Sequence, residues 1–166
     1  MIQFDFITYM EDVAIKLKDI GHNEFNKRFF RISGIAGLEE LIGELPDAQY
    51  PALMVVENNE GRISDNLGDN FVDTPSYEFY IVTNYEFADH GARAAAKKQC
   101  KTIGQKILAK MLHDSRQRLH GLDLMQFGNI PYFPVGPFGD RAISVYFRFD
   151  VNQSSGMVYN AADWEV

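Results

Sequence analysis

Hydrophobic and polar residues alternate from Ser76 to Phe87, and the pattern then changes to a helical period. One set of alternate positions in this segment is almost wholly apolar and the other is mixed, which is typical of a strand with one buried face. Beyond Asp89, which suits a helix N-cap, apolar residues recur at steps of three and four. These residues are Ala92, Ala96, Cys100, Ile103, Ile107 and Met111. The sequence therefore predicts a long strand that leads into a long helix, with Gly104 allowing the two to approach closely.

Further elements are predicted on both sides of this pair. An amphipathic helix is expected over residues 2–20, and a shorter one from Ile35 to Leu45, where Pro46 ends it. Apolar runs or alternating patterns also predict several strands. These are Phe25–Ile32, Pro51–Glu57, a short one at Leu122–Phe127, and Arg141–Val151.

Two segments lack a clear period and are predicted as irregular structure. Residues 58–75 are rich in glycine and asparagine, so we expect a long loop. This loop has few apolar residues and is expected to be mobile in the isolated subunit, with proteolysis beginning near Arg62. Residues 128–140 contain three prolines and three glycines among aromatic residues, which indicates an extended connection.

These elements predict an α+β fold in a single domain over residues 1–166. We expect a mainly antiparallel sheet of four or five strands, with the long helix and the N-terminal helix packed on one face. Composition agrees with a folded domain, because hydrophobic residues make up 46% of the chain and charged residues 23%.

The cysteine content and the N-terminus bear on the compartment. A single cysteine excludes an intramolecular disulfide and favours a reducing compartment. The first 20 residues lack a basic start before an apolar run, which argues against a signal peptide. No stretch of 18 apolar residues predicts a membrane span.

Charge is distributed unevenly along the chain. The net charge is −7, but residues 93–118 contain eight basic residues and one acid, a local +7. The remainder contains eight basic and 22 acidic residues, a local −14. An acidic body with one basic helix is a poor general binder of nucleic acid, whereas it suits association with another copy of the same chain.

No catalytic, cofactor-binding or metal-binding motif is present. The four histidines have no paired metal-ligand spacing, and there is no phosphate-binding or nucleophile motif. Cys100 lies in register with Ala96 and Ile103, which favours a buried structural thiol over a nucleophile. The acidic and amide residues between Asp65 and Asp73 lack the spacing of a calcium loop, so turn formation explains them better.

The order of elements, with YPALMVVE before the loop and YEFYIVTNYEF before the long helix, resembles small α+β proteins of phage and prophage structural modules. It is most similar to tail terminator or tail completion (minor tail) proteins. The resemblance covers residues 50–151 and implies a non-enzymatic structural subunit that forms a homo-oligomeric ring and contacts other tail or head–tail connector proteins. It also implies a place in the host bacterial cytoplasm during assembly and in a virion or tail-like particle afterwards. No cofactor, nucleic acid or membrane is implied.

Charge placement predicts where copies of the chain meet. We expect the acidic loop of one copy to contact the basic helix of the next. The expected interface residues are Glu60, Asp65, Leu67, Asp69, Phe71, Asp73, Lys97, Lys98 and Lys101. The alternative is a small-molecule-binding or enzymatic domain with a tyrosine-lined pocket. That pocket would use Tyr77, Tyr80, Tyr85, Tyr132 and Tyr146.

Overall fold

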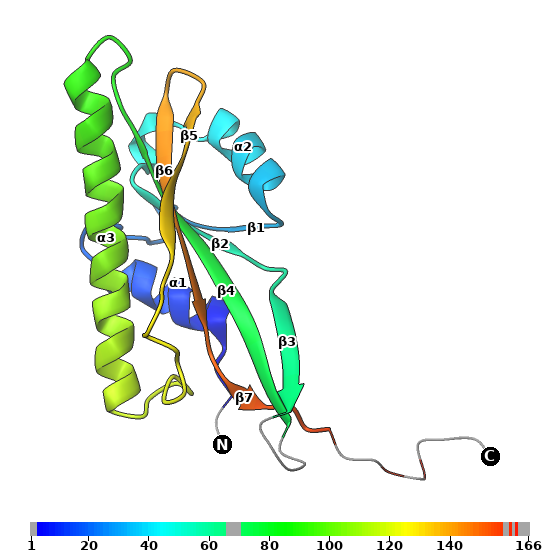
Figure 1. Cartoon of the computed structure of the whole chain (residues 1–166). Coiled ribbons are helices and arrows are strands. Elements are labelled where there is room, and N and C mark those ends of the chain that lie inside the picture. Colours follow the sequence, from blue (N-terminus) through cyan, green and yellow to red (C-terminus); the bar gives the residue numbers. More distant parts are fainter. Residues whose placement is uncertain (1–2, 66–70, 158–159, 161, 163–166) are drawn as a thin grey trace.

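The computed structural model describes residues 3–65, 71–157, 160 and 162. The helices are α1 (Phe6–Lys16), α2 (Ile35–Glu44) and α3 (His90–Arg116), with a 3-10 turn, η1, at Asp47–Gln49. The strands are β1 (Phe29–Ile32), β2 (Ala52–Val56), β3 (Glu60–Asp65), β4 (Phe71–Asn84), β5 (Tyr132–Phe138), β6 (Ala142–Asp150) and β7 (Gln153–Ser154). Figure 1 shows a long α3 beside a twisted sheet, with a narrow hairpin extending from the sheet.

The strands form one mixed sheet in the order β1-β2-β4-β6-β5. β1 and β2 are parallel and are joined through α2, which makes a β–α–β unit, while the other pairs are antiparallel. β3 and β7 pair with the first part of β4, on opposite sides of it. The predicted α+β class is confirmed, but the sheet has seven described strands and one parallel pair rather than four or five mainly antiparallel strands.

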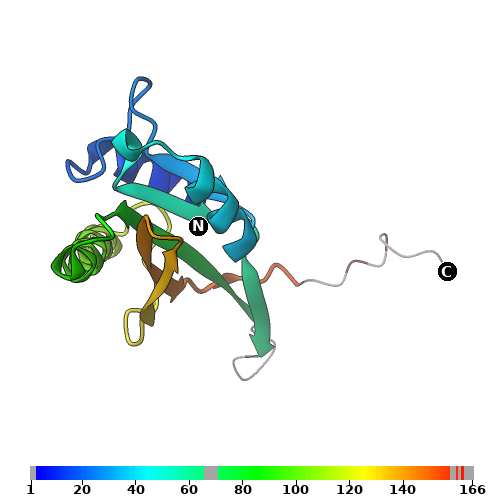
Figure 2. The ribbon, with the colours of Figure 1, turned by 90° about the horizontal axis from the view of Figure 1, so that it is seen from above.

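The sheet is covered on both faces over its central part. α1 and α3 pack on the face that carries Phe79, Ile81 and Phe147, as predicted. α2 packs on the opposite face, against Met54 and Tyr80. Figures 1 and 2 show α3 and α2 on opposite sides of the sheet. The prediction of a strand buried on only one face was therefore wrong for β4, because residues 79–83 are buried on both faces.

The predicted features of α3 are confirmed. Asp89 is its N-cap, and its side chain accepts a hydrogen bond from the Gly91 amide. Five of the six predicted apolar positions are buried, from Ala96 to Met111, while Ala92 is half-buried. A Cβ atom at Gly104 would lie 2.1 Å from Cζ of Phe147. Because only a hydrogen fits in that space, glycine allows the helix to lie directly on the β6 ring.

Both segments predicted to be irregular contain strands. Residues 60–65 form β3 and pair with residues 71–76 of β4, so most of the predicted loop is a β-hairpin. All six β3 residues are exposed. Because the strand is held by main-chain hydrogen bonds and buries no side chain, its sequence shows no alternation of apolar and polar residues. Residues 132–138 form the edge strand β5. The part of the predicted loop at residues 66–70, with Leu67 and Asp69, lies outside the described residues.

The described residues include no helix with both the length and the apolar character needed to cross a bilayer.

Candidate interface

The first half of α3 presents basic side chains beside the β5 edge of the sheet. Because the apolar face of α3 is buried on the sheet, Lys97 and Lys98 are exposed. Lys101 is half-buried, and its Nζ lies 4.5 Å from the centroid of the Tyr132 ring on β5, a cation–π contact. The helix period thus brings a cation directly over an edge-strand aromatic.

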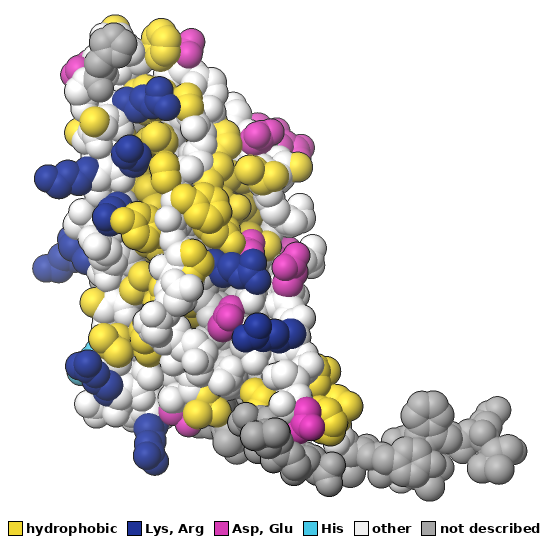
Figure 3. Space-filling model, in the orientation of Figure 1, with side chains coloured by type: hydrophobic (Ala, Val, Ile, Leu, Met, Phe, Trp, Pro, Cys, Tyr) yellow, Lys and Arg dark blue, Asp and Glu magenta, His cyan; other side chains and the backbone are white. Residues whose placement is uncertain are grey.

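β5 adds exposed aromatic side chains to this edge, with Tyr132 on the α3 face opposite Phe147 and Phe133 on the α2 face opposite Tyr146. Tyr132 is 47% exposed and Phe133 is 50% exposed. A hollow of about 370 Å³ lies between α3 and β5 and is lined by Arg93, Ala94, Lys97, Pro134, Gly136 and Ile143. Figure 3 shows hydrophobic side chains gathered over the β5 edge, with Lys and Arg side chains beside them over α3.

The acidic residues of the predicted interface lie on the β3–β4 hairpin. Glu60 and Asp65 are exposed at the two ends of β3, whereas Phe71 and Asp73 are half-buried on β4. Some of these acids have partners within the chain. A Glu60 oxygen lies 4.0 Å from the guanidinium of Arg148, and Asp73 accepts a hydrogen bond of 2.8 Å from the Gln153 amide.

The hairpin also carries an exposed apolar residue that the sequence prediction omitted. Ile63 lies at the middle of β3 and its side chain is 56% exposed. The register of the hairpin places Ile63 opposite Asp73 and therefore on the same face as Asp65 and Phe71. The only signal for it in the sequence is a single β-branched residue in a polar stretch, which is too weak to mark a contact surface.

The acidic and basic groups lie far apart within one chain. Figure 1 shows the beginning of α3 at one end of the molecule and the hairpin at the other end, on the other side of the sheet. The structure therefore brings Lys97 and Lys101 together with β5, and Glu60, Asp65 and Asp73 together on the hairpin, while Lys98 is exposed on the same half of α3. It does not bring the two sets to each other.

The five tyrosines of the alternative hypothesis, a tyrosine-lined pocket, do not line one common site. Tyr77 is buried on the α1 and α3 face, while Tyr80 and Tyr146 are buried on the α2 face, with ring centroids 5.2 Å apart. Tyr132 is at the exposed edge, and Tyr85 follows the end of β4. Burial raises the pKa of Tyr77 and Tyr80 above the usual value of a phenol.

The α1–α3 contact contains a buried polar cluster. The side chain of Asp114 on α3 is 1% exposed, accepts a hydrogen bond of 2.8 Å from the Tyr9 hydroxyl, and pairs with Lys110 one turn earlier. The His120 ring lies edge-on to Tyr9, with ring centroids 5.3 Å apart. Burial alone would raise the pKa of Asp114, but the hydrogen bonds from Lys110 and Tyr9 outweigh it and hold that pKa below its usual value. The cluster joins two helices, and Tyr9 and His120 also line a surface hollow of about 340 Å³.

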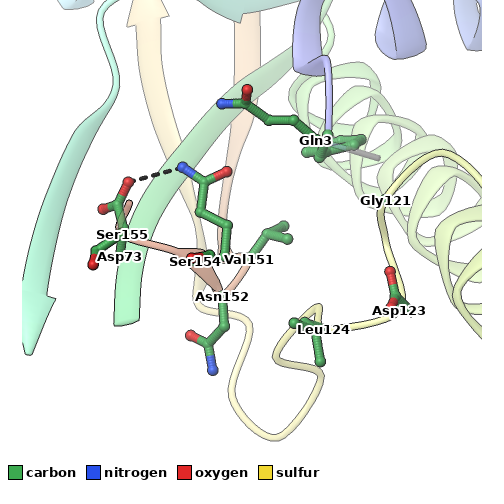
Figure 4. Close-up of a pocket in the computed structure, with 11 residues that line it drawn as sticks. Gln3, Asp73, Gly121, Asp123, Leu124, Val151, Asn152, Ser154 and Ser155 are labelled. Carbon is green, nitrogen blue, oxygen red and sulfur yellow. Dashed lines mark hydrogen bonds between the residues drawn. The ribbon is translucent and has the colours of Figure 1, made fainter. Parts of the chain in front are cut away.

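A second hollow, of about 330 Å³, lies where the loop after α3 faces β7 (Figure 4). Asp73 and Asp123 lie on opposite sides of it, and Gln153 bonds Asp73. The described residues contain no group of histidine, cysteine and acidic side chains that could hold a metal ion. Cys100 is fully buried, and burial raises the pKa of its thiol to about 12, as expected for a structural thiol.

Comparison with protein-family models gives no match for this chain. Comparison with curated proteins likewise finds no matching sequence. The geometry and charge of the chain itself therefore carry the functional proposal.

Proposed function

We propose that this protein is a non-enzymatic structural subunit of a phage-like tail or head–tail joint, and that it assembles head to tail into a homo-oligomeric ring. The observation that carries the proposal is the placement of opposite charges on two separate surfaces of one chain. Lys97 and Lys101 lie beside the β5 edge, Lys98 is exposed on the same half of α3, and Glu60 and Asp65 lie on the hairpin. Surfaces that complement each other but do not overlap form heterologous contacts, and such contacts close into rings when the rotation between subunits permits it.

Apolar residues on both surfaces support this assignment. Exposed ion pairs contribute little affinity and mainly set orientation and association rate. The exposed Tyr132 ring at the β5 edge, and Ile63 with the half-buried Phe71 on the hairpin, offer apolar area for the contact on the α3 face of the sheet. In this proposal the ring also contacts other tail or connector proteins of the particle.

The test is native mass spectrometry of the purified chain across protein and salt concentration. We expect oligomers that weaken, but persist, as salt rises. The triple variant Lys97→Glu, Lys98→Glu, Lys101→Glu should give folded monomers, and adding Glu60→Lys, Asp65→Lys and Asp73→Lys should partly restore the oligomer. A control reverses Lys16, Lys18 and Lys27, which are exposed but lie elsewhere, and should leave the oligomer intact. A wild type that stays monomeric at high concentration and low salt contradicts the proposal.

A further inference from the structure

β3 has one edge that no strand covers among the described residues. It pairs with β4 on one side only, and all six of its residues are exposed. The Pro75 carbonyl accepts from the Val151 amide and the Phe71 carbonyl accepts from the Ser155 amide, so the main-chain groups of both residues point away from β3. Because hydrogen-bonding direction alternates along a strand, residues 72, 74 and 76 bond β3 through their partners 64, 62 and 60. The amides and carbonyls of Gly61, Ile63 and Asp65 therefore point outward.

On the far side of the sheet, β5 likewise has an edge that no described strand covers. The Arg148 amide donates to the Pro131 carbonyl, which fixes the alternation along β5. Residues 131, 133 and 135 face β6, and residues 132 and 134 face outward. The missing amide hydrogen of Pro134 therefore falls on the open side, where proline is tolerated. This edge still offers both main-chain groups of Tyr132 and the carbonyl of Pro134.

The two edges match in strand direction and in the face of the sheet on which their side chains lie. β5 is parallel to β4, and β3 is antiparallel to β4, so β3 and β5 run in opposite directions. A second copy that continues the sheet in the same sense would therefore pair antiparallel. Side chains of Ile63 and Asp65 share the α3 face with those of Tyr132 and Pro134, since Tyr132 lies opposite Phe147 and Pro134 opposite Val145.

We propose that β3 of one copy adds to β5 of the next as an antiparallel strand, with Ile63 opposite Pro134 and Asp65 opposite Tyr132. This inference rests on the proposed homo-oligomeric ring and names the strands that form it. The register allows three main-chain hydrogen bonds, two between Asp65 and Tyr132 and one from the Ile63 amide to the Pro134 carbonyl.

Side chains select this register over its neighbours. Ile63 meets the hollow between α3 and β5, where Pro134 and Ile143 provide apolar contact. Asp65 comes beside Tyr132, over which the Lys101 ammonium already lies. A shift by two residues would remove Ile63 from Pro134 and Asp65 from Lys101. A shift by one residue would place the outward amides and carbonyls of one strand opposite residues of the other strand whose main-chain groups point away.

A cross-link between copies tests the register. Ser64 and Phe133 would be directly opposite in a pair without hydrogen bonds, with Cα atoms about 4.5 Å apart, which suits a disulfide. The variant Ser64→Cys, Phe133→Cys should form a ladder of covalent oligomers on mild oxidation of the native protein. The control Arg62→Cys, Phe133→Cys places the thiols on a diagonal about 7–8 Å apart and should cross-link much less. Cys100 is buried and contributes no competing thiol.

A proline substitution tests the strand contact without a cross-link. Ile63→Pro removes one outward amide and leaves the β3–β4 bonds of residues 60, 62 and 64 in place, so the variant should fold. We expect its association to weaken about tenfold or more per contact, whereas Ile63→Val, which keeps the amide, should change it little. The strand addition is overturned if the protein forms oligomers whose association is unchanged by Ile63→Pro and whose two cysteine pairs cross-link equally or not at all. That result would not contradict the proposed ring. A wild type that is always monomeric overturns both proposals.

Discussion

The two halves of β4 belong to regions of opposite character. Residues 79–83 are buried between α3 on one face and α2 on the other, and Phe79 stacks on Phe147 with ring centroids 5.0 Å apart. Residues 71–76 lie in the hairpin, where β3 is fully exposed. Residues 79–83 therefore contribute mainly to stability, whereas residues 71–76 belong to an exposed part of the molecule. A single strand can do both because main-chain pairing continues after side-chain packing has ended.

Core truncation should give the largest contrast between the two regions. Ile103→Ala or Ile107→Ala removes a side chain that is 1% exposed under the sheet, and should lower the free energy of unfolding by about 2–5 kcal/mol. Ile63→Ala on the hairpin should change it by less than about 0.5 kcal/mol, because that side chain already contacts water. Denaturant titration of dilute protein measures both. Equal losses would mean that the hairpin is part of the cooperative core.

The polar α1–α3 contact should contribute less than the apolar core. Asp114→Asn weakens charge-assisted hydrogen bonds from Lys110 and Tyr9, and should cost about 1.5–3 kcal/mol at neutral pH. Because the pKa of Asp114 is lowered in the folded state, its contribution is complete above the unfolded-state pKa of about 3.9 and is lost as pH falls through the folded-state pKa. Melting curves of both proteins between neutral and acidic pH should therefore converge. A gap that persists at low pH would assign the loss to packing.

Two helical glycines should respond in opposite directions to the same change. Gly104→Ala forces a methyl group into the Phe147 ring and should destabilise the protein by about 1–3 kcal/mol. Gly43→Ala on α2 meets no atom within 4 Å and should stabilise it by about 0.5–1 kcal/mol through helix propensity. Thermal unfolding compares the pair. If both variants are stabilised, α3 can move away from β6.

Amide hydrogen exchange should give the smallest but most local difference. In dilute protein at high salt, the outward amides of Gly61 and Ile63 should exchange faster than those of Arg62 and Ser64, which bond β4. Amides of residues 79–82 in β4 should exchange slowest. A hairpin whose six amides exchange at one rate would show that it opens as a unit.

The sequence was sufficient to predict elements in which the pattern of apolar and polar side chains follows their burial. α3 was predictable because its apolar period and its Asp89 cap are both local signals. The α2 helix and the buried β2 strand were found for the same reason. The covering of both faces of β4 was not, because Glu78 and Asn84 suggested a solvated face, whereas α2 is brought there by the parallel β1–β2 pair.

The candidate interface was predicted in part. The clusters of charged residues could be identified in the sequence, but the surfaces to which they belong are defined by the neighbouring strands β3 and β5. β3 shows no apolar period because its pairing uses only the main chain, and β5 was hidden by Pro134 and Pro137. Alternation places the first of these prolines on the open side of the strand, which sequence alone does not show. Ile63 and Phe133 became candidates only once both edges were defined.

The contact between Gly104 and Phe147 offers a spectroscopic reporter of helix–sheet docking. A glycine α-proton held against an aromatic ring experiences its ring current, so its resonance should lie well away from the random-coil position. Loss of that displacement would report separation of α3 from the sheet even while both elements keep their secondary structure. One backbone resonance could thus follow the packing of α3 on the sheet in the isolated chain and in the proposed oligomer.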